Sequence, residues 1–231
     1  MAEKIEKVIL LDINDYSNDE NAGIITVLGK NGVFSLLAMG INKGNSKNKS
    51  NLQVGSLIEI EYFKARLNNK LNKLKKAKLL YEIDYSNKFN LVYVAKATKF
   101  LKNFTSNAVN IINTYIETFE FLGKGYNDFL LTYLIANSLY YFGLKPNIES
   151  CVECNSPGNL CDFEFYIGGY LCALHAKKQR WTKELKSVYY LFQNLKTYMQ
   201  ICIPQVNNKI YLELLHYLKD NGIYINWEQE Y

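Results

Sequence analysis

The sequence predicts an α+β protein in which a small antiparallel β-barrel is followed by a helical domain with a loop-rich insertion. Short apolar and β-branched runs joined by turn residues fill the first 83 positions. After Asp84, apolar residues recur at helical spacing. Cysteines cluster in a stretch between two of the later helical segments. We therefore expect one domain at residues 1–83 and a second at 84–231, with the insertion at 147–178.

Five segments of the first domain have the pattern of strands. In one of them, Glu59 and Glu61 alternate with apolar residues, which is typical of a strand with one buried face. Asn31-Gly32 lies between two apolar runs and predicts a hairpin turn. Five strands with a polar loop at 42–51 indicate a small barrel, either of the OB type, which binds oligonucleotides, or of the SH3-like type. The expected strands are 7–13, 23–28, 33–39, 57–63 and 74–83.

The positive charge of the chain is concentrated in this first domain. The formal net charge is +5, but residues 41–80 hold ten basic side chains and only two acidic ones. Such an excess favours a binding surface for a polyanion over an ordinary solvated face, which mixes both signs. Only two residues of the chain are arginine, and lysine suits phosphate better than base edges. The candidate residues for contacts with a nucleic-acid backbone are Lys43, Lys47, Lys49, Arg66, Lys73, Lys75 and Lys76.

The second domain should be mostly helical. Apolar residues at helical spacing predict helices over 86–102 and 105–122, with Phe89, Val92 and Tyr93 among the core residues of the first. The uncharged run 129–144 is too short and polar for a membrane span and indicates a buried helix. Further helices are expected at 182–200 and 207–221.

The start of the chain has no secretory signal, so we expect a cytoplasmic protein. Disulfides do not persist there, and the five cysteines should be free, catalytic or metal-bound. No Gly-x-x-x-x-Gly-Lys-Ser/Thr loop is present, so nucleotide hydrolysis is not expected.

Cysteine and histidine in the insertion have the spacing of a zinc site. Cys151-x2-Cys154 is followed after seventeen residues by Cys172-x2-His175. Three thiolates and one imidazole would complete a tetrahedral, closed and therefore structural zinc site. Cys161 lies between the pairs and is an alternative ligand. A redox role for the first cysteine pair is less favoured, because no thioredoxin-like strand precedes it.

The order of these parts resembles the RecO family of DNA repair proteins. The most specific stretch is Gly-Leu-Lys-Pro at 143–146, then the Cys-x2-Cys pair, then Gly-Gly-Tyr-Leu-Cys at 168–172. The turn at 28–32 and the loop at 38–50 also resemble that family. Three departures are His175 in place of a common cysteine, Asn155 in place of glycine, and Leu28 in place of threonine.

The resemblance implies a non-enzymatic recombination mediator associated with the nucleoid. Such proteins bind single- and double-stranded DNA and anneal complementary strands. With RecR they help load RecA onto DNA coated by single-stranded-DNA-binding protein. They also bind the acidic, apolar tail of that coating protein, for which Lys177, Lys178 and Arg180 are the candidate residues.

Two other classes remain open from the sequence. A zinc-dependent hydrolase or deaminase would need an open metal position and a general base such as Glu153 or Glu164. The His-x-Glu motif of the zinc deaminases is absent. An RNA-binding OB-fold protein would share the basic barrel.

Overall fold

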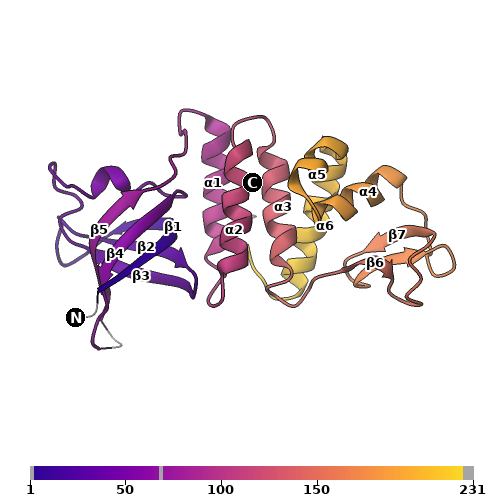
Figure 1. The fold of residues 1–231 in the computed structure, drawn as a ribbon, viewed down its shortest axis with the longest axis horizontal. Helices are drawn as coiled ribbons and strands as arrows, with labels where there is room; N and C mark the ends of the chain where they lie inside the picture. Colours follow the sequence, from indigo (N-terminus) through magenta and orange to yellow (C-terminus); the bar gives the residue numbers. More distant parts are fainter. Residues whose placement is uncertain (1–2, 68–69, 226–231) are drawn as a thin grey trace. The chain divides into compact units, whose positions relative to one another are not determined.

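The computed structural model describes residues 3–67 and 70–225, and contacts divide the chain into two compact units. The first contains the residues up to Gly123, and the second runs from Lys124 to Ile225 (Figure 1). Helices α1 and α2 therefore belong to the same compact unit as the barrel. The domain boundary after Ile83, which the sequence predicts, stays a prediction.

The first unit contains a closed five-stranded barrel with the strand order β1-β2-β3-β5-β4 (Figure 1). Strand β1 pairs with both β2 and β4, and the barrel closes through a short parallel pairing of β3 with β5. This topology is that of an OB barrel, so the predicted fold class is confirmed. The strands are β1 (Glu3–Asp15), β2 (Gly23–Gly29), β3 (Gly32–Ala38), β4 (Leu57–Phe63) and β5 (Asn72–Leu79).

Alternation along the strands builds the barrel core. In β4, Ile58, Ile60 and Tyr62 are buried, while Glu59 and Glu61 lie on the outer face, as the pattern predicts. Inward-facing residues of the other strands join them in one apolar cluster that includes Val8, Leu10, Ile25, Val27 and Leu36. The outer face is therefore left to charged side chains.

Helices α1 (Lys88–Leu101) and α2 (Val109–Thr118) pack on the barrel, and the short η2 turn (Phe119–Phe121) follows α2. The buried Tyr115 hydroxyl donates to the Gly55 carbonyl over 2.9 Å. Gly32 has a φ of +106°, and a Cβ there would lie 2.3 Å from the backbone of Thr105. Only glycine fits where the β2–β3 turn meets the segment before α2.

The predicted core face of α1 is wrong in two positions. Phe89 and Val92 are 63% and 51% exposed, whereas Tyr93, Val94 and Phe100 are buried. Both sets follow helical spacing, because apolar residues occur on more than one side of this helix. Periodicity alone therefore could not decide which set faces the barrel.

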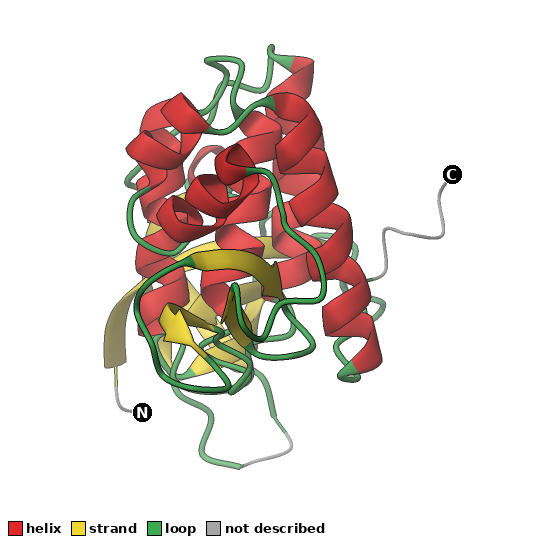
Figure 2. Ribbon diagram, turned by 90° about the vertical axis from the view of Figure 1, so that its right-hand side faces the viewer, coloured by secondary structure: helices red, strands yellow, loops and turns green. Residues whose placement is uncertain are grey.

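The second unit combines four helices with a small sheet (Figures 1 and 2). Helix α3 (Asn127–Ser138) is buried along almost its whole length, as expected for the uncharged run. The single helix expected at 182–200 is instead two, α4 (Thr182–Leu191) and α5 (Leu195–Ile201). The break occurs because the Asn194 side chain accepts from the Thr197 N–H and caps a new helix. Helix α6 (Pro204–Asp220) follows.

The insertion is not a plain loop but carries a three-stranded sheet in the order β6-β8-β7. Its strands are β6 (Asn147–Cys151), β7 (Leu160–Glu164) and β8 (Gly169–Cys172). Gly169, at the start of β8, has a φ of +149°, and a Cβ there would lie 2.2 Å from the Asn147 carbonyl oxygen. Among the described residues, no helix is both long and apolar enough to cross a membrane.

Candidate metal centre and nucleic-acid interface

The four predicted metal ligands lie together at one end of the small sheet. One donor atom from each of Cys151, Cys154, Cys172 and His175 lies within 4.8 Å of all the others. The Cys154 and Cys172 sulfurs are 3.8 Å apart, and His175 Nδ1 lies 3.3 Å from the Cys172 sulfur and 3.7 Å from that of Cys151. Zinc–ligand lengths and tetrahedral angles require about 3.8 Å between sulfurs and about 3.5 Å between sulfur and nitrogen. The donor set and its spacing therefore fit a zinc ion.

The two ligand pairs are placed by strand ends and tight turns. Strand β6 ends at Cys151 and the neighbouring strand β8 ends at Cys172. The Asn155 N–H donates to the Cys151 carbonyl over 2.8 Å, and the His175 N–H donates to the Cys172 carbonyl over 2.9 Å. Asn155 has a φ of +58°, a left-handed conformation that asparagine tolerates better than most side chains. This explains how asparagine replaces glycine here.

Backbone donors favour the thiolate form of Cys151. Burial disfavours its charge, but the N–H groups of Cys172, Cys154 and Glu153 outweigh that effect and lower its pKa to about 6. A thiolate at neutral pH is what a metal ligand requires. Cys161 lies outside the cluster of four.

The carboxylates considered as general bases do not complete an open site. Glu164 forms a 2.9 Å ion pair with Lys178, and Glu153 is exposed on the turn between the first two ligands. Four donors already satisfy tetrahedral coordination, which leaves no position for a reacting water. Aromatic residues of the insertion pack on each other and on α6: the Phe165 ring contacts both Phe163 and Tyr217.

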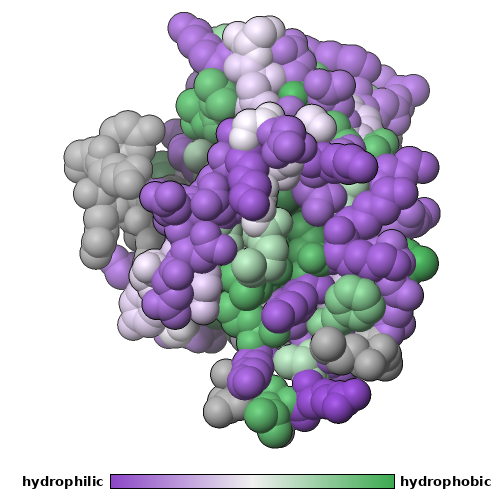
Figure 3. Space-filling view, turned by 90° about the vertical axis from the view of Figure 1, so that its left-hand side faces the viewer, coloured by the Kyte–Doolittle hydropathy of each residue, from purple (hydrophilic) through white to green (hydrophobic). Residues whose placement is uncertain are grey.

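The basic residues of the first unit lie on the outer face of the barrel and in its loops. Lys43, Lys47 and Lys49 are exposed in the loop between β3 and β4, and Arg66 is exposed in the loop after β4. On β5, Lys73 and Lys76 face solvent, and so does Lys78, which the candidate set had omitted. Hydrophilic side chains cover most of the molecule on this side, with apolar side chains exposed between them (Figure 3).

Lys75 differs from the other lysines because two carboxylates bind its ammonium group. It lies at a bulge of β5, forms an ion pair with Glu3, and contacts Glu61 over 2.6 Å. Hydrogen bonds from Lys75 to Glu3 and Glu61 raise its pKa. Within the described residues, the remaining candidate lysines on the barrel form no ion pair. No described carboxylate therefore neutralises their charge.

The three candidate partner-binding residues have different surroundings. Arg180 is almost buried, with 8% of its side chain exposed, and contacts Asp162 and Glu213 at 3.2 and 3.1 Å. Lys178 pairs with Glu164, and Lys177 is exposed. Through its ion pairs with Asp162 and Glu213, Arg180 links β7 to α6.

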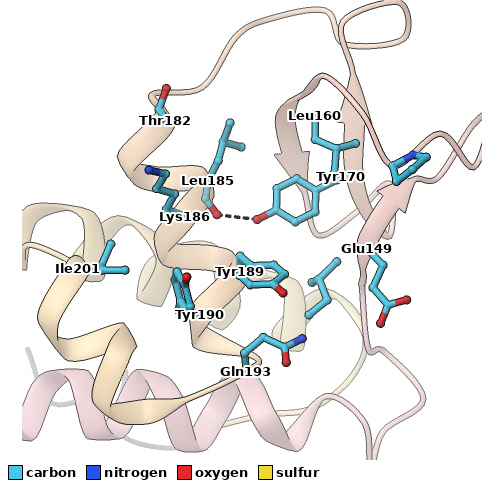
Figure 4. Close-up of a pocket in the computed structure, with 12 residues that line it drawn as sticks. Glu149, Leu160, Tyr170, Thr182, Leu185, Lys186, Tyr189, Tyr190, Gln193 and Ile201 are labelled. Atoms are coloured by element: carbon cyan, nitrogen blue, oxygen red, sulfur yellow. Dashed lines mark hydrogen bonds between the residues drawn. The ribbon is translucent and has the colours of Figure 1, made fainter.

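An apolar groove that the sequence did not indicate lies between the small sheet and helices α4 and α5. It has a volume of about 660 Å³. Tyr170, Leu185, Tyr189 and Tyr190 line it, with Lys186 at its side (Figure 4). The Tyr170 hydroxyl donates to the Leu185 carbonyl over 2.6 Å and fixes one wall. Tyrosines spread over two elements gave no sequence signal, because only the fold brings them together.

Comparison with known proteins gives one consistent result. Residues 1–83 match the family model described as Recombination protein O N terminal. The chain is 25% identical over 236 residues to DNA repair protein RecO of Mesoplasma florum, covering 96% of this chain and 87% of that protein. It is 30% identical to DNA repair protein RecO of Mycoplasma capricolum and 31% identical to that of Mycoplasma mycoides. Those alignments cover 64% and 62% of this chain, and about half of each relative, 52% and 53%.

Proposed function

We propose, from the premise that this chain is a RecO-type protein of DNA repair and recombination, that it is a recombination mediator without enzymatic activity. It would bind single- and double-stranded DNA through residues 1–83 and anneal complementary strands. Residues 84–231 would carry the metal site and the contacts with partner proteins. The single observation that carries the proposal is that Lys73, Lys76 and Lys78 lie on the outer face of an OB barrel and form no ion pair with any described residue.

Charge neutralisation is the proposed mechanism. The unpaired lysines Lys47, Lys49, Lys73 and Lys76, with Lys43 and Arg66 in the flanking loops, would contact phosphates and reduce the repulsion between two strands. Complementary bases could then pair without nucleotide hydrolysis. Because lysine contacts phosphate as a point charge, little sequence preference is expected.

Zinc is the proposed structural cofactor. Cys151, Cys154, Cys172 and His175 would hold it, and the bound ion would stabilise the fold of the insertion. The protein ligands fill the coordination sphere, and this closed donor set supports the non-enzymatic proposal over a hydrolase or a deaminase.

The proposed partners are RecR, single-stranded-DNA-binding protein and, indirectly, RecA. The acidic, apolar tail of the coating protein would bind the second unit, where the groove in Figure 4 offers aromatic walls and Lys186. Lys177 and Lys178 remain candidates for its carboxylates, whereas Arg180 already forms ion pairs with Asp162, Glu184 and Glu213. A cytoplasmic, nucleoid-associated location follows from these proposed partners.

The salt dependence of DNA binding tests this proposal. Fluorescence anisotropy would measure the affinity for a labelled oligonucleotide at several salt concentrations. We expect affinity to fall steeply with salt, and replacement of Lys43, Lys73 and Lys76 by alanine to flatten the slope. A slope that these substitutions leave unchanged would contradict the assignment. Competition with RNA of the same sequence distinguishes the rival: preferential displacement by RNA would indicate an RNA-binding barrel.

A further inference from the structure

Strand β5 has one edge that the barrel does not cover with another strand. Its first edge pairs with β4 over almost its whole length, from Lys73 to Leu79. Its second edge pairs with β3 only through Asn72 and Lys73. Backbone groups of β5 beyond Lys73 on this second edge therefore need other partners.

Two asparagine side chains of the basic loop supply those partners. The Asn48 amide oxygen accepts from the Ala77 N–H over 3.0 Å, and its nitrogen donates to the Lys75 carbonyl over 3.3 Å. The Asn51 amide oxygen accepts from the Leu79 N–H over 3.1 Å. The Asn51 nitrogen donates back to the Lys47 carbonyl over 3.2 Å. The two side-chain amides thus form hydrogen bonds with β5 of the kind that a neighbouring strand would form, and they attach the loop along β5.

This attachment decides where the loop lysines lie. Lys47 and Lys49 flank Asn48, so they are held beside the part of β5 that presents Lys76 and Lys78. All four lysines are exposed, and none forms an ion pair with a described residue. Two short rows of free positive charge therefore run next to each other.

Like charges in two adjacent rows repel each other, most strongly at low salt. An attachment made of ion pairs would weaken as salt rises, and it would neutralise lysines of this surface. Neutral hydrogen bonds between amides and backbone do not depend on salt in this way, and they leave the lysines charged. They also fix the loop before any ligand arrives, so that binding does not have to order it.

We propose that Asn48 and Asn51 are positioning residues that hold the basic loop against β5, so that Lys47 and Lys49 form a second row of phosphate contacts beside Lys76 and Lys78. This inference rests on the proposed function, since it concerns the same nucleic-acid surface. The ligand is a polyanion with a phosphate backbone.

The test compares four proteins by anisotropy with a labelled single-stranded oligonucleotide across a salt series. They are the wild type, Asn48→Ala/Asn51→Ala, Lys47→Ala/Lys49→Ala, and the protein with all four changes. Each phosphate contact contributes about 0.7 to the slope of log affinity against log salt for single strands. We expect the two lysine substitutions to lower the slope by about 1.4. The two asparagine substitutions should lower it by nearly as much. Once both lysines are gone, the asparagine changes should have no further effect.

A matched control is Asn45→Ala, an exposed asparagine of the same loop for which no hydrogen bond is recorded among the described residues. It should bind like the wild type. If the asparagine pair binds with the wild-type slope, or weakens binding equally with and without Lys47 and Lys49, the inference is overturned. The second result would mean that the barrel itself is perturbed. Should the double variant fail to fold, Asn51→Ala alone, followed through the same cycle, decides between these outcomes.

These outcomes are separate from failure of the proposed function. A wild-type protein without salt-dependent binding would remove the proposed function itself. A wild type that binds, with asparagine variants that bind identically, would remove only the positioning role.

Discussion

Removal of the metal should release the ligand turns of the small sheet while the rest of the second unit stays folded. The metal end of the sheet has little core of its own: Cys151, Leu171 and Cys172 form its buried cluster, with Val152 and Leu160 partly buried against them. Burial of so few side chains is worth about 4 kcal/mol. A tetrahedral structural zinc site contributes about 10–16 kcal/mol at pH 7. The metal should therefore be the main source of local stability.

Strand β7 has a different source of stability. Phe163 and Phe165 are buried, and the Phe165 ring stacks on Tyr217 of α6 at 5.7 Å between centroids. Arg180 adds ion pairs to Asp162 and Glu213. These contacts do not involve the metal ligands, so β7 should stay in place when the metal is removed.

Amide hydrogen exchange read by mass spectrometry measures this difference. After chelation, the amides of residues 151–156 and 172–176 should exchange at the rate of an unstructured peptide. Peptides from β7 and from the barrel should keep their protection. Cys172→Ser should reproduce the chelated pattern, and Cys161→Ser, outside the four donors, should not. Unchanged exchange at 151–156 after verified loss of metal would refute the reasoning.

Three further predictions address the barrel and the sheet. Lys75→Ala should leave the salt slope of DNA binding nearly unchanged, because two carboxylates already bind that lysine. Lys76→Ala should lower the slope by about 0.7 for single strands. Equal effects of the two substitutions would contradict this difference between the two lysines. Gly169→Ala should weaken zinc affinity in a chelator competition, because its Cβ would lie 2.2 Å from a carbonyl of β6. Gly158→Ala should leave zinc affinity unchanged, because there is open space around Gly158. Equal zinc affinities of the two variants would argue against the close packing at Gly169. Burial opposes ionisation of Asp12, but its lysine partner outweighs this and lowers its pKa below the ordinary 3.8, so its contribution is present above that pH and is lost as pH falls further. Asp12→Asn should therefore cost about 0.5 kcal/mol in urea unfolding at pH 7 and progressively less as pH falls below 3.8. A pH-independent difference would exclude the ion pair as its cause.

The parts of the fold that follow from local pattern were predictable from sequence. The alternation around Glu59 and Glu61 identified β4 with its bounds at 57–63. The Cys-x2-Cys and Cys-x2-His spacing identified four residues that the fold brings together and that could hold a metal ion. Both signals are short-range: one depends on a period of two, the other on pairs that share a turn. A buried helix at α3 was likewise evident from its uncharged run.

What depends on tertiary contacts could not be predicted in this way. Helix α1 has apolar residues on several sides, so only docking on the barrel shows that Phe89 is exposed. Lys75 and Lys76 are neighbours with the same chemistry, and only the bulge in β5 directs Lys75 toward Glu3. Asn48 and Asn51 resemble ordinary loop residues until the free edge of β5 is known. Charge counting thus located a basic surface, and the structure shows which of its lysines, Lys75, pairs with described carboxylates and which do not.

The measurement that tests the central claim most directly is annealing of complementary strands coated with single-stranded-DNA-binding protein, in the absence of nucleotide. Fluorescent labels on the two strands would report duplex formation over time. We predict that the wild type accelerates annealing and that the variant with alanine at Lys47, Lys49, Lys76 and Lys78 does so far less. Annealing at the uncatalysed rate with the wild type, or full acceleration by the variant, would contradict the account.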